Sequence, residues 1–131
     1  MIGGKLNVLI VEDNKINAIV LRKGIEKLCH VKWARNDTEA FAATAKEDFQ
    51  LILMDINLGG DSLDGEAIMR KIKSDDRFAD MHIYAVTSYA MPGDRERFIA
   101  AGFDEYFAKP IDKKALLRSI ETLQGLRGTS S

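Results

Sequence analysis

The sequence has little of what marks several large classes of protein. Its single cysteine, Cys29, excludes an internal disulfide and favours a reducing compartment. No apolar run approaches the roughly 20 residues that cross a bilayer, and no secretory signal pattern is present. The net charge is −1 with no basic block, so no footprint for nucleic acid is visible. We therefore expect a cytoplasmic protein that binds neither nucleic acid directly nor membranes.

What is present suits one soluble domain. The 131 residues are 46 % hydrophobic and 30 % charged, which allows one sizeable core under a polar surface. Cys29, in "KLCHV", is expected at the end of a helix as a buried packing thiol. His30 and His82 lie far apart with no metal-ligand spacing around them, and we interpret both as ordinary residues.

Short apolar runs alternate with helical periods along the chain. The runs predict strands at 8–11, 31–34, 51–54, 83–88 and 106–108. Apolar residues at helical spacing predict helices around Ala18–Leu28, 38–47, Ile68–Ile72, 94–101 and Leu116–Leu123. Strand followed by helix, five times over, indicates an α/β domain with a parallel sheet and right-handed crossovers. Nearly continuous apolar strands indicate a sheet that is covered on both faces.

Polar residues and glycine mark several helix ends. Gly102 is placed to end the helix at 94–101, and Pro92 fits its start. We expect helix N-caps at three residues that precede helical patterns: Asn14, Asp37 and Asp112.

Two of the buried strands end in acid. The stretch "LILMDINL" (51–58) runs from four apolar residues into Asp55, and "NVLIVEDN" (7–14) runs into Glu12 and Asp13. In an open parallel sheet, ligands bind outside the C-terminal strand ends, where the strand order reverses. In one common strand order, 2-1-3-4-5, the first and third strands flank that point. We therefore expect the three carboxylates to converge.

Converging carboxylates repel one another and need compensation. A divalent cation such as Mg²⁺ would supply it, and so would a fixed positive charge. Lys109 follows the fifth strand in "YFAKP", and Thr87 lies at the end of the fourth, so an amine and a hydroxyl are expected at the same edge. Each residue alone has an ordinary interpretation, such as a cap, a turn or a solvated charge. Their occurrence at four strand ends together favours a functional site.

The pieces "VLIVEDN", "LILMDINL", "AVTSYA" and "EYFAKP", with their intervals, resemble the receiver domain of two-component response regulators. The resemblance covers residues 6–124. It implies a single flavodoxin-like domain with five parallel strands in the order 2-1-3-4-5 and five helices on both faces. Residues 1–5 and 125–131 are then expected to be flexible ends or linker.

The resemblance also implies a chemistry. Asp55 would be the phosphoacceptor, taking a phosphoryl group from a phosphohistidine on a histidine kinase or a histidine phosphotransfer domain. The side chains of Glu12, Asp13 and Asp55 and the backbone carbonyl of Asn57 would hold Mg²⁺ or Mn²⁺. The metal and Lys109 would neutralise the incoming phosphoryl oxygens. The protein would thus carry out its own phosphorylation and dephosphorylation and would not be an enzyme for a separate substrate.

In the family pattern, a hydroxyl and an aromatic ring report phosphorylation, and here they would be Thr87 and Tyr106. The hydroxyl would move toward the phosphoryl group and the ring would turn inward, reshaping a partner-binding face over 91–124. The Lys109–Pro110 bond is expected to be cis, aiming Lys109 into the site.

Two departures from the family pattern stand out. The loop after the third strand reads "NLGGDSLDG", which is longer than usual, so Asp61 or Asp64 could approach the metal. In "NDTEA" (36–40), Asp37 stands where the family often has Gly, and we expect only a changed turn there.

Other functions stay open. A phosphatase of the haloacid dehalogenase type also uses a nucleophilic aspartate, but it needs a second aspartate two residues later, where this chain has Asn57. A flavin or nucleotide module needs a Gly- or hydroxyl-rich loop after the first strand, and "EDNKIN" is acidic. A receiver-like binding module that is never phosphorylated is the third alternative. No effector domain follows residue 124, which fits a stand-alone regulator, a phosphorelay intermediate, or one part of a hybrid kinase or larger regulator.

Overall fold

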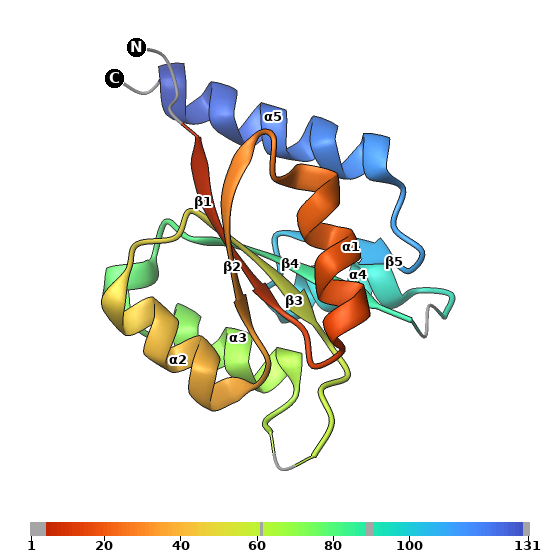
Figure 1. The fold of residues 1–131 in the computed structure, drawn as a ribbon. Coiled ribbons are helices and arrows are strands. Elements are labelled where there is room, and N and C mark those ends of the chain that lie inside the picture. Colours follow the sequence, from red (N-terminus) through yellow and green to blue (C-terminus); the bar gives the residue numbers. More distant parts are fainter. Residues whose placement is uncertain (1–4, 61, 89–90, 130–131) are drawn as a thin grey trace.

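The chain folds around one parallel sheet with strand order β2-β1-β3-β4-β5, the order that the family resemblance implied (Figure 1). The computed structural model describes residues 5–60, 62–88 and 91–129. The strands are β1 (Leu6–Val11), β2 (Cys29–Ala34), β3 (Leu51–Asp55), β4 (His82–Thr87) and β5 (Glu105–Ala108). The helices are α1 (Lys15–Ile25), α2 (Asp37–Lys46), α3 (Gly65–Lys73), α4 (Asp94–Ala101) and α5 (Lys113–Thr129), with a short 3₁₀ turn, η1 (Asp76–Phe78), after α3.

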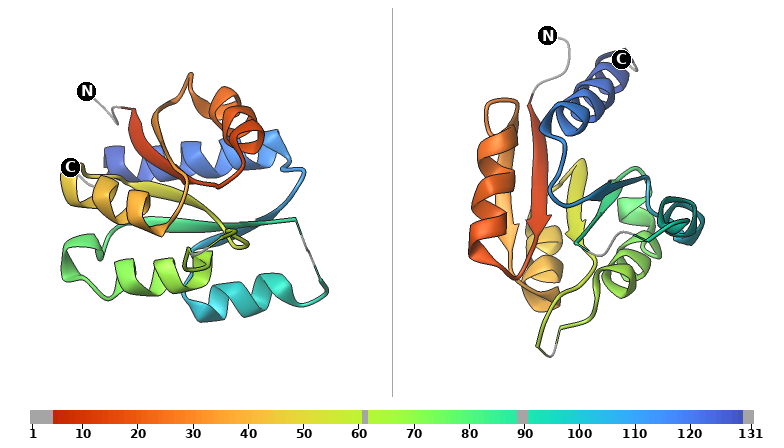
Figure 2. Two further views of the ribbon diagram at one scale, coloured as in Figure 1. Left: turned by 60° about the horizontal axis from the view of Figure 1, so that its bottom comes forward. Right: turned by 90° about the vertical axis from the view of Figure 1, so that its right-hand side faces the viewer.

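The helices cover both faces of the sheet. Figure 2 shows α1 and α5 on one side and α2, α3 and α4 on the other. Side chains alternate along a strand, so β1 sends Leu9 into the core under α2–α4 and Val8 and Ile10 into the core under α1 and α5. All five residues of β3 are buried. Burial on both faces explains why the central strands are continuously apolar.

Two of the three predicted N-caps are confirmed. Asn14 Oδ1 accepts a hydrogen bond from the Asn17 amide at 2.9 Å, and Asp112 Oδ1 accepts one from the Lys114 amide at 3.0 Å. The third was wrong by one residue: the cap of α2 is Asn36, which has an extended backbone, and Asp37 is the first residue of the helix. Asp37 is therefore free to use its carboxylate elsewhere.

The first helix is shorter than its pattern suggested. It ends at Ile25, and Leu28 lies in the following turn. Cys29 is the first residue of β2, paired with Leu6, and does not end a helix. Strand pairing of this kind is long-range and leaves no mark on helical periodicity. The predicted burial is confirmed, since Cys29 is 3 % exposed and burial raises the pKa of its thiol to about 11.

The structure also defines the ends of the last two helices. Gly102 ends α4 with a φ of 129°, in the region that favours glycine, as predicted. Helix α5 continues to Thr129, beyond the boundary expected at 124, while residues 1–4 and 130–131 fall outside the described residues. The domain boundaries stay a prediction. Within the described chain, no helix combines the length and the apolarity needed to cross a membrane.

Candidate functional site

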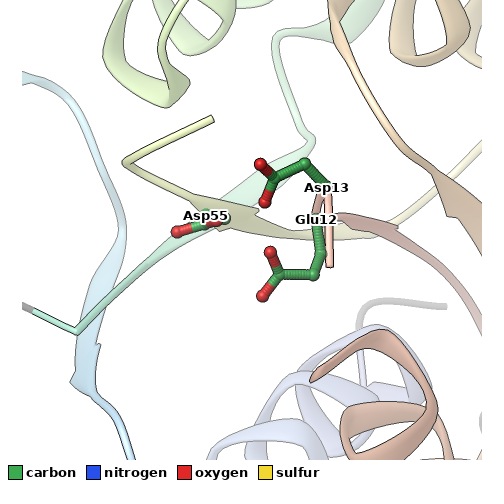
Figure 3. Close-up of side chains that lie close together, drawn as sticks. All are labelled: Glu12, Asp13 and Asp55. Carbon is green, nitrogen blue, oxygen red and sulfur yellow. The ribbon is translucent and has the colours of Figure 1, made fainter. Parts of the chain in front are cut away.

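Three carboxylates meet at the C-terminal edge of the sheet (Figure 3). Glu12 and Asp13 follow β1, and Asp55 is the last residue of β3. Because Val11 of β1 pairs with Met54 of β3, the two acidic ends lie at the same level. One carboxylate oxygen from each of the three acids lies within 4.8 Å of those of the others. Glu12 and Asp55 are only 1 % and 6 % exposed, whereas Asp13 is exposed.

One amine compensates this group. Lys109 Nζ lies 2.6 Å from Glu12 Oε1 and 3.8 Å from Asp55 Oδ1. Its backbone amide donates to the Thr87 carbonyl at 2.7 Å, which ties the residue after β5 to the end of β4. The Lys109–Pro110 bond is cis, as expected. One positive charge beside three carboxyl groups leaves the site short of positive charge.

That shortage appears in the pKa values. Burial raises the pKa of Asp55 to about 7, and the neighbouring Glu12 adds to the effect. Burial acts in the same direction on Glu12, but hydrogen bonds with Asp55 and Lys109 hold the pKa of Glu12 below its ordinary value. Ionising Glu12 and Asp55 at the same time therefore costs free energy. An all-oxygen donor set that lacks positive charge is what a hard divalent cation requires, so these residues fit such a metal.

We expect Asp55→Asn to stabilise the metal-free protein at alkaline pH. The pKa of Asp55 is about 7 in the folded protein against 3.8 for an ordinary aspartate, so its contribution to stability is present below 3.8 and is lost as pH rises through 7. Asparagine stays neutral, so at about pH 8 the free energy of unfolding should rise, by at most about 4 kcal/mol, which corresponds to the full difference between the two pKa values. Urea unfolding with chelator at several pH values measures this. Asp48→Asn, at an exposed site, should change little, and an equal gain there would contradict the prediction.

Thr87 and Asn57 join the acids. Thr87, at the end of β4, is 2 % exposed, and its Oγ1 accepts a hydrogen bond from Asn57 Nδ2 at 3.4 Å. The backbone amide of Asn57 donates a hydrogen bond to Asp55 Oδ1 at 3.3 Å. The structure therefore brings six of the predicted residues to one edge of the sheet: Glu12, Asp13, Asp55, Asn57, Thr87 and Lys109.

Tyr106 packs against helix α4. Its ring stacks on Phe98 of α4, with centroids 5.6 Å apart and an interplanar angle of 17°. Its hydroxyl oxygen is buried and has no hydrogen-bond partner among the described residues. Burial raises the pKa of this phenol above its ordinary value. Tyr106 thus belongs to the layer under α4, where a ring movement would change the surface of that helix.

Gly65 is a site residue to which sequence reasoning gave no role. It begins α3, and its amide donates to the Ile56 carbonyl at 3.1 Å. A Cβ at this position would collide with the backbone carbonyl of Asp55 and come within 2.9 Å of Ile56 Cα. Glycine is required because α3 begins directly against the end of β3. The "DG" dipeptide at 64–65 was the available signal.

Among the described residues, no fourth acid joins the three carboxylates. Asp64 caps α3, with its Oδ1 accepting from the Ala67 amide at 2.8 Å, and it is not part of the acidic group. Asp61 falls outside the described residues.

Trp33 forms a hydrogen bond to the acidic turn, by which we mean Glu12 and Asp13 after β1. Its indole Nε1 donates to the Glu12 carbonyl at 2.7 Å. It lies on β2, opposite Ile10 of β1, and is 37 % exposed. Nothing in the sequence marked it, because the contact depends on strand register.

Asp37 does more than change a turn, so that expectation was wrong. Its Oδ2 accepts a hydrogen bond from the Leu63 amide at 3.1 Å, and its own amide donates to Ser62 Oγ at 3.0 Å. In the same loop, the Gly59 amide donates to Asp13 Oδ2 at 3.0 Å. The long loop after β3 is therefore bonded to the start of α2 and to the acidic turn.

Comparison with known proteins agrees with this geometry. Residues 8–121 match the model of the response regulator receiver domain. The polar-differentiation response regulator DivK of Brucella anthropi is 36 % identical over 123 residues. The match covers 93 % of this chain and 96 % of the DivK chain. Hybrid signal transduction histidine kinase G of Dictyostelium discoideum is 34 % identical over 116 residues, 86 % of this chain but 3 % of that protein.

Solved structures agree as well. The signal receiver domain of a DNA-binding response regulator from Colwellia psychrerythraea has a TM-score of 0.83 at 26 % identity, covering 91 % of this chain and 98 % of its own. The resemblance expected from the sequence motifs is thus confirmed, and with it the flavodoxin-like fold. The chain belongs to the family of response regulator receiver domains.

Proposed function

We propose that Asp55 accepts a phosphoryl group from a phosphohistidine and that the chain acts in two-component signalling or a phosphorelay. The environment of Asp55 is the main support for this proposal. Its carboxylate ends a buried strand, with Glu12 and Lys109 beside it and with Asn57 hydrogen-bonded to both Asp55 and Thr87. A carboxylate held in this way is suited to act as a nucleophile toward phosphorus.

The transfer can be written in terms of these residues. An ionised Asp55 oxygen attacks phosphorus and forms a P–O bond, while the P–N bond to the donor imidazole breaks. The electron pair of that bond leaves with the imidazole, which takes up a proton. Lys109 Nζ, 3.8 Å from Asp55 Oδ1, neutralises charge on the transferred oxygens, and the Thr87 hydroxyl donates a hydrogen bond to one of them.

We assign the divalent cation to the acidic group. The side chains of Glu12, Asp13 and Asp55 and the backbone carbonyl of Asn57 would hold Mg²⁺ or Mn²⁺, since all four donors are oxygen. When bound, the cation supplies the positive charge that the site lacks and neutralises the phosphoryl oxygens.

The same residues argue for self-modification over turnover of a separate substrate. A haloacid dehalogenase-type phosphatase would need an aspartate at position 57, where Asn57 instead donates its side-chain amide to Thr87. A receiver-like module that is never phosphorylated is the competing function, and it predicts no phosphate on Asp55.

We propose a cytoplasmic histidine kinase or phosphotransfer domain as the donor. DivK is named as a response regulator and kinase G as a hybrid kinase, which supports this class of partner. A groove of about 440 Å³ between α1 and the start of α5 includes Lys109 and Val20 in its lining, and Ile16 and Val20 of α1 are 67 % and 65 % exposed. An apolar surface beside Lys109 suits a donor domain that must bring its histidine to Asp55. A downstream protein would bind the 91–124 face.

Phosphate uptake tests the proposal. The protein is incubated with acetyl phosphate and Mg²⁺, and its intact mass is measured. We expect one phosphate adduct in the parent and in Asp48→Asn, and none in Asp55→Asn or after addition of chelator. An adduct that still forms in Asp55→Asn would refute the assignment of Asp55 as the acceptor. An adduct that forms equally well in the presence of chelator would refute the requirement for a metal.

A further inference from the structure

The two departures from the family pattern, Asp37 and the long loop after β3, bond to each other. Asp37 Oδ2 accepts from the Leu63 amide at 3.1 Å, and the Asp37 amide donates to Ser62 Oγ at 3.0 Å. Ser62 Oγ in turn donates to the Leu63 carbonyl at 2.8 Å. The hydrogen bond from Leu63 is the main reason that the pKa of Asp37 lies below its ordinary value. Two hydrogen bonds thus fasten the second half of the loop to the start of α2, and the third lies within the loop.

The first half of the same loop reaches the acidic group. The Gly59 amide donates to Asp13 Oδ2 at 3.0 Å. Gly60 follows with a φ of 69°, a left-handed conformation that favours glycine and turns the chain back. A Cβ on Gly59 would come within 3.0 Å of the Asp13 carboxylate, so this contact is close. The loop therefore spans from α2 to a carboxylate of the acidic group.

Asp13 needs such a contact more than its neighbours do. Glu12 is buried and bonded to Lys109, and Asp55 is buried at the end of β3, whereas Asp13 is exposed. An exposed aspartate samples several rotamers and loses entropy when it binds a metal. A hydrogen bond to a ligating carboxylate fixes its orientation before the metal arrives.

We propose that Asp37 is a positioning residue for the metal site. By holding Ser62 and Leu63, it keeps the loop where the Gly59 amide orients the carboxylate of Asp13. The metal part of this inference rests on the proposed function, while the loop part does not. The long loop and Asp37 would then act together to orient a metal ligand.

Four variants test the inference by NMR without any phosphodonor. Asp37→Ala removes the acceptor for Leu63. Asp37→Asn removes the charge but keeps an oxygen that can accept the bond. Ser62→Ala removes the other tether, and Asp75→Ala is the matched control, since Asp75 is an aspartate that also accepts a backbone amide, from Arg77. The first readout is hydrogen exchange at the Gly59 amide. The second is Mg²⁺ affinity, followed at the indole resonance of Trp33, the only tryptophan, which is bonded to the Glu12 carbonyl.

Asp37→Ala should speed exchange at Gly59 and weaken Mg²⁺ binding by roughly tenfold, the lower end of the range for loss of outer contacts at metal sites, because Asp37 acts through the loop. Ser62→Ala should shift both readouts in the same direction by less. Asp37→Asn should stay close to the parent, because its remaining oxygen can still accept the hydrogen bond from Leu63, and Asp75→Ala should also stay close to the parent. Equal losses in Asp37→Asn and Asp37→Ala would overturn the inference, because charge would then explain the effect. Unchanged exchange at Gly59 in Asp37→Ala overturns the loop part whether or not Mg²⁺ binds. If the parent binds no Mg²⁺, the metal role of Asp37 falls together with the proposed metal, while the exchange readout still decides the loop part.

Discussion

Gly65→Ala should impair phosphorylation by displacing the backbone next to Asp55. A Cβ at position 65 would collide with the Asp55 carbonyl and approach Ile56 Cα to 2.9 Å, so either α3 or the end of β3 must move. Overpacking of this kind costs about 1–3 kcal/mol. Because the nearest obstructed atom is the carbonyl oxygen of the proposed acceptor, we also expect the rate of phosphate uptake to fall at least about tenfold, the effect of roughly 1.4 kcal/mol on a barrier.

The measurement pairs thermal unfolding with intact-mass kinetics in acetyl phosphate. Gly125→Ala is the matched control, since Gly125 lies in α5 and a Cβ added there would meet no atom within 4 Å. Alanine is favoured over glycine in a helix by about 1 kcal/mol, so the control should be as stable as the parent or more so, and fully active. A Gly65→Ala protein with parental stability and rate would show that the close approach of α3 to Asp55 does not matter.

Thr87→Ala should separate phosphorylation from its consequence. The hydroxyl donates one hydrogen bond to the phosphoryl group but neither attacks phosphorus nor supplies positive charge, so uptake should continue at a reduced rate. Phosphorylation adds nearly two negative charges, and we propose that Thr87 responds to them and lets the Tyr106 ring move. Without the hydroxyl, the response over 91–124 should be largely lost, because a population shift needs a differential interaction of a few kcal/mol.

The test is NMR of the Tyr106 ring and of the amides over 91–124, with and without a beryllofluoride mimic. In the parent, both should shift together with the surroundings of Asp55. In Thr87→Ala, only the surroundings of Asp55 should shift. Because the Tyr106 ring stacks on Phe98 and its hydroxyl is buried, a changed ring environment should be visible at α4 first. If the amide resonances over 91–124 do not shift in the parent, the protein carries phosphate without a conformational switch.

Much of this fold could be predicted because local signals agreed with tertiary structure. The apolar strands were visible since β1 and β3 are covered on both faces, and the acids at their ends marked the edge of the sheet where Glu12 and Asp55 meet. Lys109 and Thr87 could be added because parallel strands end at the same edge. Asn14 and Asp112 could be assigned as caps from their own helices.

What was missed depends on residues far apart in sequence. Helical periodicity ran through Leu28 because it carries no information on the pairing of Cys29 with Leu6. The bond from Trp33 to Glu12 needs the register of β2 on β1. The hydrogen bond from Leu63 to Asp37 was missed because Leu63 lies in a loop whose path no propensity specifies.

The most direct test of the central claim is to locate the phosphate. The protein is phosphorylated with acetyl phosphate and Mg²⁺, then reduced with borohydride, which converts an aspartyl phosphate to homoserine, and its peptides are sequenced by tandem mass spectrometry. The account predicts homoserine at position 55 and unchanged residues at Glu12 and Asp13. Homoserine at Asp13 or at any other aspartate, or phosphate retained on His30 or His82, would contradict it.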